Sequence, residues 1–150
     1  QRSLFDEMPA AGFNDFERAV ATFLDAQEPL YFWYRNWARR DYYVQGWQRD
    51  KIYPDFIVTT MRRAKSAGGQ EMDRVFVVET KGQHLAGVQD SHGKTTDTGY
   101  KRDVFTLCTK LAQEKDWGEF APFMRNKQMC YEVVDQDGWE ARLSELLCGT

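Results

Sequence analysis

The order of elements along the chain predicts an α/β fold of the mixed α+β kind, in which a small mixed sheet is flanked by helices. An amphipathic helix pattern comes first, three segments of strand composition follow, and a helix, a further strand and a terminal helix complete the chain. With 150 residues, the chain has the length of one domain with a buried core. We therefore expect one domain, residues 1–150, in the order α-β-β-β-α-β plus a C-terminal helix.

The first helix is expected to begin at Asn14 or Asp15, because either residue can cap a helix N-terminus. It should end within residues 25–29, which include a proline. Glu17 lies at the edge of the apolar arc of this helix rather than opposite it. The arc itself consists of Phe13, Phe16, Val20, Phe23 and Leu24.

Several segments with strand composition follow this helix. Residues 30–37 are rich in aromatic side chains and fit either a strand or an irregular buried segment. Residues 42–47 and 52–60 are expected to be two strands joined by a hairpin connection at residues 48–51. Residues 74–81 have a continuous apolar run, which predicts a strand in the centre of the sheet.

Two polar, glycine-bearing stretches are expected to be loops. Residues 62–71 predict a mobile loop, and residues 82–99 predict a long functional or disordered loop. A helix is expected at about residues 100–114, a last strand at residues 128–134, and an amphipathic helix at residues 139–147.

The composition excludes several classes of protein. Twenty Lys and Arg against 23 Asp and Glu give a net charge of −3, so bulk charge does not hold a nucleic acid here. Three widely spaced cysteines without a CxxC pair argue against a disulfide framework or a zinc site, and favour the cytoplasm. No apolar run approaches the roughly 20 residues of a membrane helix, and we expect no membrane association. Because the chain begins at Gln1 rather than Met, we expect it to be part of a longer protein.

Two acidic residues occupy strand positions where a core strand rarely holds charge. Asp55 stands at the start of the second strand, and Glu79 closes the apolar run of the third, with Lys81 on the same face. If these strands form an antiparallel hairpin, Asp55 lies close to Glu79, and two such carboxylates repel each other unless a cation lies between them. Hard oxygen ligands favour Mg²⁺ or Mn²⁺. Lys81 would then activate the attacking water or stabilise charge at phosphorus, which predicts metal-assisted phosphodiester hydrolysis.

The pair Pro54–Asp55 together with Glu79–Thr80–Lys81 resembles the PD-(D/E)xK nuclease superfamily. This resemblance implies a restriction-endonuclease-like core with the order helix, three strands, helix, strand. The wider pattern is similar to the C-terminal endonuclease domain of type III restriction-enzyme Res subunits and related helicase–nuclease proteins, over about residues 13–135. The segments that carry the wider similarity are residues 34–37, 46–47, 52–58 and 77–82.

The resemblance implies a function and a set of site residues. Asp55, Glu79 and the backbone carbonyl of Thr80 would bind Mg²⁺, with Mn²⁺ as a substitute, and Lys81 would serve catalysis. Glu17 would assist through the metal or its water shell. The substrate would be double-stranded DNA, and the setting the prokaryotic cytosol. No GxxxxGK[ST] motif occurs in the chain, so ATP is expected only at an upstream helicase domain, and a methyltransferase subunit is an expected partner.

Weaker expectations concern contacts with DNA. In the loop of residues 82–99, Gln83, His84 or Lys94 would touch the DNA backbone, and the loop would be mobile without DNA; the alternative is a spacer without contacts. Lys101 and Arg102 either contact a phosphate or form a solvated first helical turn.

Other residues are expected to have ordinary structural roles. For Arg35, Arg39 and Arg40, a solvated face is favoured over a basic patch. We favour loop polarity over metal binding or general-base work for the two histidines, His84 and His92. Buried packing rather than base stacking is expected for Trp33, Trp37 and Trp47.

Alternative functions remain open from the sequence. Asp55 and Glu79 can be strand-end acids that face solvent, and Glu17 a solvated helix residue. The fold can also belong to a catalytically idle DNA-binding or docking module. A third alternative is a repair or recombination nuclease of the same superfamily.

Overall fold

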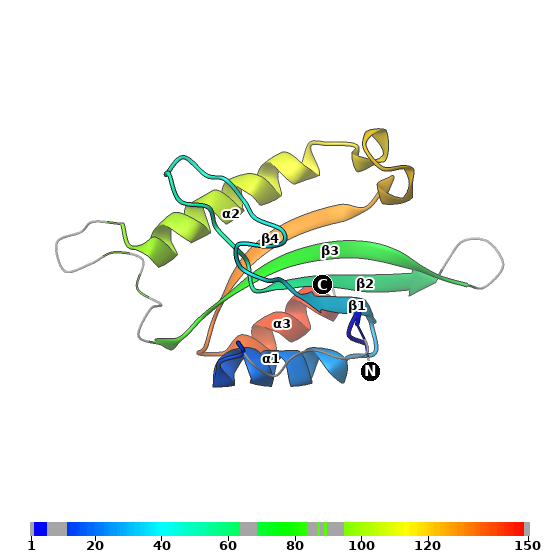
Figure 1. Cartoon of the computed structure of the whole chain (residues 1–150). Helices are drawn as coiled ribbons and strands as arrows, with labels where there is room; N and C mark the ends of the chain where they lie inside the picture. Colours follow the sequence, from blue (N-terminus) through cyan, green and yellow to red (C-terminus); the bar gives the residue numbers. More distant parts are fainter. Residues whose placement is uncertain are drawn as a thin grey trace.

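The computed structural model of the chain has a four-stranded sheet with helices on both of its faces (Figure 1). The structure describes residues 2–5, 12–63, 69–83, 87, 89 and 95–148. The predicted order of helices and strands is confirmed. The elements are α1 (Asp15–Asp25), β1 (Leu30–Arg35), β2 (Phe56–Arg63), β3 (Gln70–Lys81), α2 (Asp97–Gln113), the short 3-10 helices η2 (Trp117–Glu119) and η3 (Pro122–Met124), β4 (Gln128–Asp135) and α3 (Trp139–Cys148).

The sheet has the strand order β1-β2-β3-β4 and is mixed. The pairs β1–β2 and β2–β3 are antiparallel, whereas β4 lies parallel to β3, and α2 provides the connection that a parallel pair requires. The predicted central position of the third strand is therefore confirmed, and the last seven residues of β3 are all buried. At the start of β2, Phe56 lies opposite Val78, and the N–H of Asp55 donates to the Val78 carbonyl at 2.9 Å. The next position in this register sets Asp55 opposite Glu79.

The alternation of side chains along β3 gives the sheet two packed faces. Phe76 and Val78 belong to a core that also holds Val20 and Leu24 of α1. Val77, between them in sequence, packs in a second core with residues of α2. Figure 1 shows the same arrangement, with α1 and α3 together on one face and α2 across the other.

Helix α1 begins as predicted, with Asn14 as its cap. The Glu17 N–H donates to Asn14 Oδ1 at 2.8 Å, and the Asn14 N–H donates to Glu17 Oε2 at 3.2 Å, which completes a capping box. Helix α2 begins at Asp97, earlier than predicted, because the Thr96 hydroxyl accepts the N–H of Gly99 and caps the helix there. The end of the expected loop is therefore helical.

The strand predicted at residues 42–47 is wrong. The first strand of the sheet is the aromatic segment β1, and residues 42–47 make only one isolated bridge, between Val44 and Ile52. The segment packs instead against α2. Gly46 lies so close to this helix that an added Cβ would be 2.3 Å from the Tyr100 hydroxyl oxygen and 2.7 Å from Val104 Cγ2. This contact, rather than a strand partner, decides the path of the chain.

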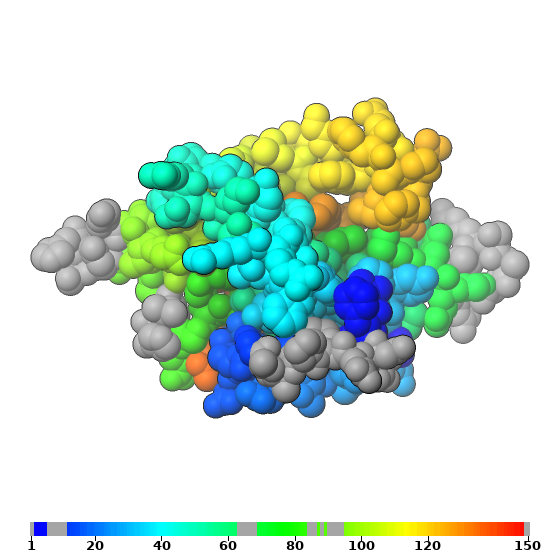
Figure 2. Space-filling view, in the orientation of Figure 1, coloured from blue at the N-terminus to red at the C-terminus, as the bar shows by residue number. Residues whose placement is uncertain are grey.

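The side chain of Asn36 holds the two ends of the segment between β1 and β2. Its amide nitrogen donates to the carbonyls of Tyr42 and Pro54, each at 2.8 Å, and its Oδ1 accepts the Tyr42 N–H at 3.0 Å. The segment lies at the surface in Figure 2, where its cyan atoms stand between α2 and α1. The chain thus leaves β1, crosses to α2, and returns to the sheet at Asp55.

The expected loop at residues 62–71 is partly strand, since β2 continues to Arg63 and β3 begins at Gln70. Residues 64–68 and, in the second expected loop, residues 84–86, 88 and 90–94 lie outside the described residues. Among the helices that the structure describes, none is both long and apolar enough to cross a membrane.

Candidate active site

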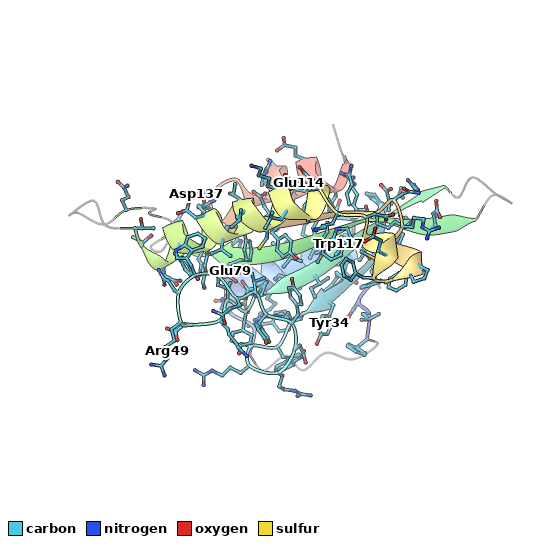
Figure 3. The ribbon with its side chains drawn as sticks, turned by 90° about the horizontal axis from the view of Figure 1, so that it is seen from above. Tyr34, Arg49, Glu79, Glu114, Trp117 and Asp137 are labelled. Carbon is cyan, nitrogen blue, oxygen red and sulfur yellow. The ribbon has the colours of Figure 1, made fainter. Side chains whose placement is uncertain are left out.

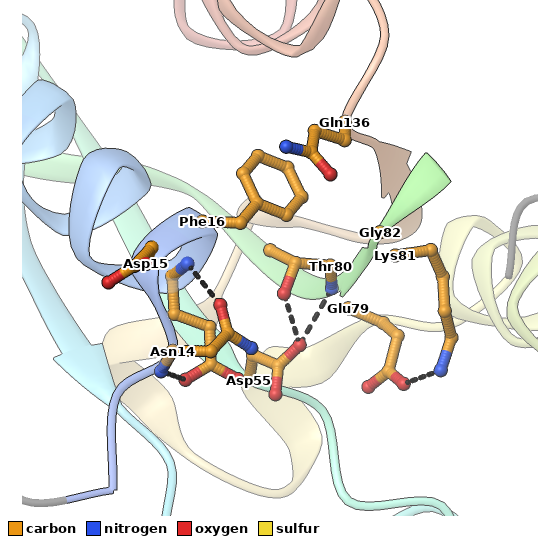
Figure 4. A pocket seen from close by; sticks show the side chains of 10 residues that line it. Asn14, Asp15, Phe16, Asp55, Glu79, Thr80, Lys81, Gly82 and Gln136 are labelled. Atoms are coloured by element: carbon orange, nitrogen blue, oxygen red, sulfur yellow. Dashed lines mark hydrogen bonds and ion pairs between the residues drawn. The ribbon is translucent and has the colours of Figure 1, made fainter. Parts of the chain in front are cut away.

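The predicted acids meet in a hollow of about 550 Å³ where β2 begins and β3 ends. The N-terminus of α1 closes one side of the hollow, and the chain after β4 contributes Gln136 (Figure 4). The residues that line it are Asn14, Asp15, Phe16, Glu17, Asp55, Glu79, Thr80, Lys81, Gly82 and Gln136. The structure therefore brings together Glu17, Asp55, Glu79, Thr80 and Lys81, all predicted site residues.

The carboxylate of Asp55 is held mainly by Thr80. Its Oδ2 accepts both the backbone N–H and the hydroxyl of Thr80, each at 2.7 Å (Figure 4). Its Oδ1 accepts a long hydrogen bond of 3.4 Å from Arg35. Burial raises the pKa of Asp55 above its ordinary value, although the Thr80 hydrogen bonds and the charge of Arg35 act in the opposite direction. Asp55 Oδ1 is thus held less firmly than Oδ2. The ligand role of the Thr80 carbonyl stays a prediction.

Glu79 is the most deeply buried acid of the site. Its Oε1 receives the amines of Lys81 and Lys101, each at 2.8 Å. Its Oε2 is buried and has no hydrogen-bond partner among the described residues. Burial, followed by the nearby charge of Asp55, raises the pKa of Glu79. A buried acceptor without a partner is costly, so this oxygen has a free position for a cation or a donor.

The two lysines on Glu79 come from different elements. Lys81 ends β3, and Lys101 lies in the second turn of α2. Both amines also approach Asp97, at 3.8 and 3.3 Å respectively. Burial alone would lower the pKa of Lys101, but the Glu79 charge, the hydrogen bond to Glu79 and the charge of Asp97 raise it. Lys101 therefore stays charged and faces the site, whereas the sequence suggested only a phosphate contact or a solvated turn.

Arg35 is the site residue that the sequence argument missed. It ends β1, and its side chain is only 14% exposed. One nitrogen, Nη2, donates to Glu17 Oε2 at 2.9 Å, and the other, Nη1, reaches Asp55 Oδ1. The solvated face favoured for Arg35 is therefore wrong. The available signal was a basic residue at the end of an aromatic strand, but strand composition does not show which acids this residue meets.

Glu17 has two partners in the structure. The same Oε2 that closes the capping box at Asn14 accepts the hydrogen bond from Arg35. The residue is buried, so the alternative of a solvated helix residue is wrong. Its predicted role at the metal stays a prediction.

The residues expected to touch DNA lie in several places. Gln83 donates from its side chain to Asp137 at 2.5 Å at the exposed end of β3. Arg102 pairs with Asp135 and donates to the Val133 carbonyl at 3.3 Å, so it turns toward the end of β4. His84 and Lys94 lie outside the described residues, as does His92. Their contacts with DNA stay predictions.

The tryptophans divide between core and surface. Trp33 is buried as predicted, but Trp47 is 62% exposed, so the expectation of buried packing is wrong for Trp47. Its ring packs edge to face with that of Tyr100 in α2, with the centroids 5.2 Å apart. In Figure 3, Glu79 lies within the molecule near α2, whereas Arg49, which belongs to the same β1–β2 segment as Trp47, projects outward.

The donor set suits a hard cation with few protein ligands. In the part of the chain that the structure describes, no three His, Cys, Asp or Glu side chains cluster closely enough to hold a metal ion by themselves. Mg²⁺ commonly binds through only one or two carboxylates, together with waters and substrate phosphate oxygens. Asp55 Oδ1 and the unpaired Glu79 Oε2 supply that number, so these residues fit the ion.

Comparison of the chain with family models, with curated proteins and with solved structures finds no match.

Proposed function

We propose that this chain is a metal-dependent DNA endonuclease domain that hydrolyses phosphodiester bonds. One observation carries the proposal: Asp55, Glu79 and Lys81 meet in one hollow, and the buried Glu79 Oε2 has no partner among the described residues. Two acids and a lysine with this arrangement suit the transfer of a phosphoryl group to water.

Asp55 and Glu79 would hold Mg²⁺, with help from the Thr80 carbonyl and with Mn²⁺ as a substitute. When bound, the ion would supply positive charge to the scissile phosphate and lower the pKa of a water. The protein's own contribution is to keep both acids in place. Thr80 fixes Asp55 through two hydrogen bonds of 2.7 Å, and the two lysines fix Glu79 through its Oε1.

Lys81 is the proposed catalytic cation. Its amine is 2.8 Å from Glu79 Oε1, and its side chain is only 9% exposed, so it has a defined position at the hollow. From there it would orient the attacking water and stabilise the negative charge that develops on the phosphate oxygens. Lys101 would hold Glu79 from the other side, and Glu17 would assist through the water shell of the ion.

We further propose that the domain is the cleavage module of a type III restriction enzyme, acting on double-stranded DNA in the prokaryotic cytosol. An upstream helicase domain would use ATP, and a methyltransferase subunit would be the partner. The resemblance of residues 34–37 and 46–47 to the endonuclease domain of such enzymes supports this proposal. In the structure, Asn36 and Gly46 of these segments shape the chain that leads to Asp55. A repair or recombination nuclease would share the same chemistry but not these partners.

The deciding experiment is cleavage of duplex DNA by the full-length protein with Mg²⁺ and ATP. We expect Lys81→Ala to reduce cleavage on the order of 100-fold or more. Lys110→Ala, which changes an exposed lysine of α2, is the matched control and should cut like the wild type. Undiminished cleavage by Lys81→Ala would contradict the proposal.

A metal titration separates the enzyme from an idle DNA-binding or docking module. The enzyme is expected to bind Mn²⁺ through Asp55 and Glu79 and to lose affinity for Mn²⁺ in Asp55→Ala. An idle module would show no difference between the two proteins.

A further inference from the structure

The guanidinium of Arg35 lies between two acids of the site. Its Nη2 donates to Glu17 Oε2 at 2.9 Å, and its Nη1 is 3.4 Å from Asp55 Oδ1. Both carboxylates are largely buried, with side-chain exposures of 9% and 16%. Two buried carboxylates near each other require a shared cation or a shared proton. On this side of Asp55, the protein already provides the cation.

Further hydrogen bonds and ring contacts hold Arg35 in this position. Nη1 also donates to the carbonyls of Asn36 and Asp55, at 2.9 and 3.0 Å. Its guanidinium carbon lies 5.4 Å from the ring centroid of Phe13 and 5.5 Å from that of Phe56. Cation–π contacts combined with several directed hydrogen bonds are an environment that suits arginine better than lysine. The side chain is thus a permanent part of the site.

The charges of the site nearly balance before any metal ion enters. Three carboxylates, two of them buried and Asp55 half-buried, face three cationic side chains, and the exposed Asp97 beside the lysines adds one further negative charge. The carboxylates are Glu17, Asp55 and Glu79, and the cations are Arg35, Lys81 and Lys101. One divalent ion would leave a net charge that a DNA phosphate can offset, whereas two would leave a large excess of positive charge in a buried place.

The acceptor oxygens that are still free also indicate one metal ion. Glu79 Oε2 has no partner among the described residues, and Asp55 Oδ1 has only the long contact with Arg35. One oxygen of Glu17, Oε2, is already occupied by two donors, Arg35 and the Asn14 N–H. The space between Glu17 and Asp55 thus already holds a cationic group, whereas the space toward Glu79 offers a new ion the acceptors Asp55 Oδ1 and Glu79 Oε2.

From these contacts we propose that Arg35 is the built-in second cation of the site, so that the domain binds one divalent metal ion, through Asp55 and Glu79. The proposal rests on the metal-dependent function above and makes it more specific. Arg35 is a positioning residue: it neutralises Glu17 and places its charge beside Asp55 Oδ1. Glu17 then acts through Arg35 and not as a metal ligand.

The test counts bound Mn²⁺ on the full-length protein by electron paramagnetic resonance, without DNA or nucleotide, over micromolar to millimolar metal. The variant Asp55→Ala/Glu79→Ala, measured in the same way, gives the background of Mn²⁺ bound elsewhere on the protein, which is subtracted. We expect one ion for the wild type and for Arg35→Lys, which keeps the charge. We expect two for Arg35→Met, because Glu17 and Asp55 then lack their cation. Glu17→Gln/Arg35→Met should return to one, and the control Arg49→Met, at an exposed arginine, should stay at one.

Each outcome decides between the proposals. Two ions in the wild type, or one ion in a folded Arg35→Met, would overturn the inference about Arg35 and leave the metal-dependent function standing. No saturable Mn²⁺ in the wild type would contradict the proposed function itself. If Arg35→Met does not fold, Glu17→Gln decides: one ion with unchanged affinity supports the inference, and loss of the ion makes Glu17 a ligand and overturns it.

Discussion

Replacing Gly46 with alanine tests whether the contact between the β1–β2 segment and α2 shapes the site. An added Cβ would lie 2.3 Å from the Tyr100 hydroxyl oxygen and 2.7 Å from Val104 Cγ2, well inside van der Waals contact. Both neighbours are buried. Tyr100 is 4% exposed and its hydroxyl accepts the N–H of Gln48 at 3.1 Å, and Val104 is 2% exposed.

The expected cost follows from these distances. Overpacking of a well-packed core costs about 1–3 kcal/mol, and the lower entropy of the unfolded chain with alanine returns about 0.4–1 kcal/mol. We therefore expect Gly46→Ala to lower the free energy of unfolding by about 1–2 kcal/mol and Tm by about 2–8 °C. Because Tyr100 directly precedes Lys101, we also expect weaker contact between Lys101 and Glu79 and slower DNA cleavage.

Thermal unfolding of the purified domain measures the first effect. Gly69→Ala is the matched control, because no atom lies within 4 Å of its added Cβ. This control should be neutral or stabilised by up to about 1 kcal/mol. The reasoning is refuted if Gly46→Ala unfolds at or above the wild-type temperature, or if both variants shift Tm equally.

Three further predictions concern the charges of the site. Lys101→Met should reduce cleavage on the order of 100-fold, because Glu79 loses one of its two amines; unchanged cleavage rates in a DNA assay would exclude this role. Burial raises the pKa of Asp55 and Glu79 in the folded domain. The stability that this shift gives to the metal-free domain is therefore fully present below about pH 4, and it is lost as pH rises through the raised pKa values. Denaturant unfolding across pH should show this decline, and it should flatten in Asp55→Asn/Glu79→Gln; parallel curves would contradict it. Mn²⁺ at about 100 times its Kd should stabilise the wild-type domain by about 2.7 kcal/mol, and calorimetry should find no such shift in Asp55→Asn.

Local patterns in the sequence account for most of the secondary structure. Asn14 and the apolar spacing that follows it predict α1, and the continuous apolar run of residues 75–78 predicts the central strand. Each of these signals lies within one element, so it can be recognised without knowing which elements pack beside it. Residues 42–47 are the counterexample. Their composition suits a strand, but the close approach of Gly46 to Tyr100 is a contact between distant parts of the chain and overrides it.

The acids and the first lysine of the site follow from the sequence alone. Glu79 and Lys81 share a strand face by simple alternation, and an antiparallel hairpin brings Asp55 opposite Glu79. Only the tertiary structure decided which further cations these acids meet. Arg35 reaches Glu17 because β1 packs beside α1, and Lys101 reaches Glu79 because α2 crosses the other face of the sheet. The angle and depth at which separate elements pack depend on the whole core, and no periodicity within one element records them.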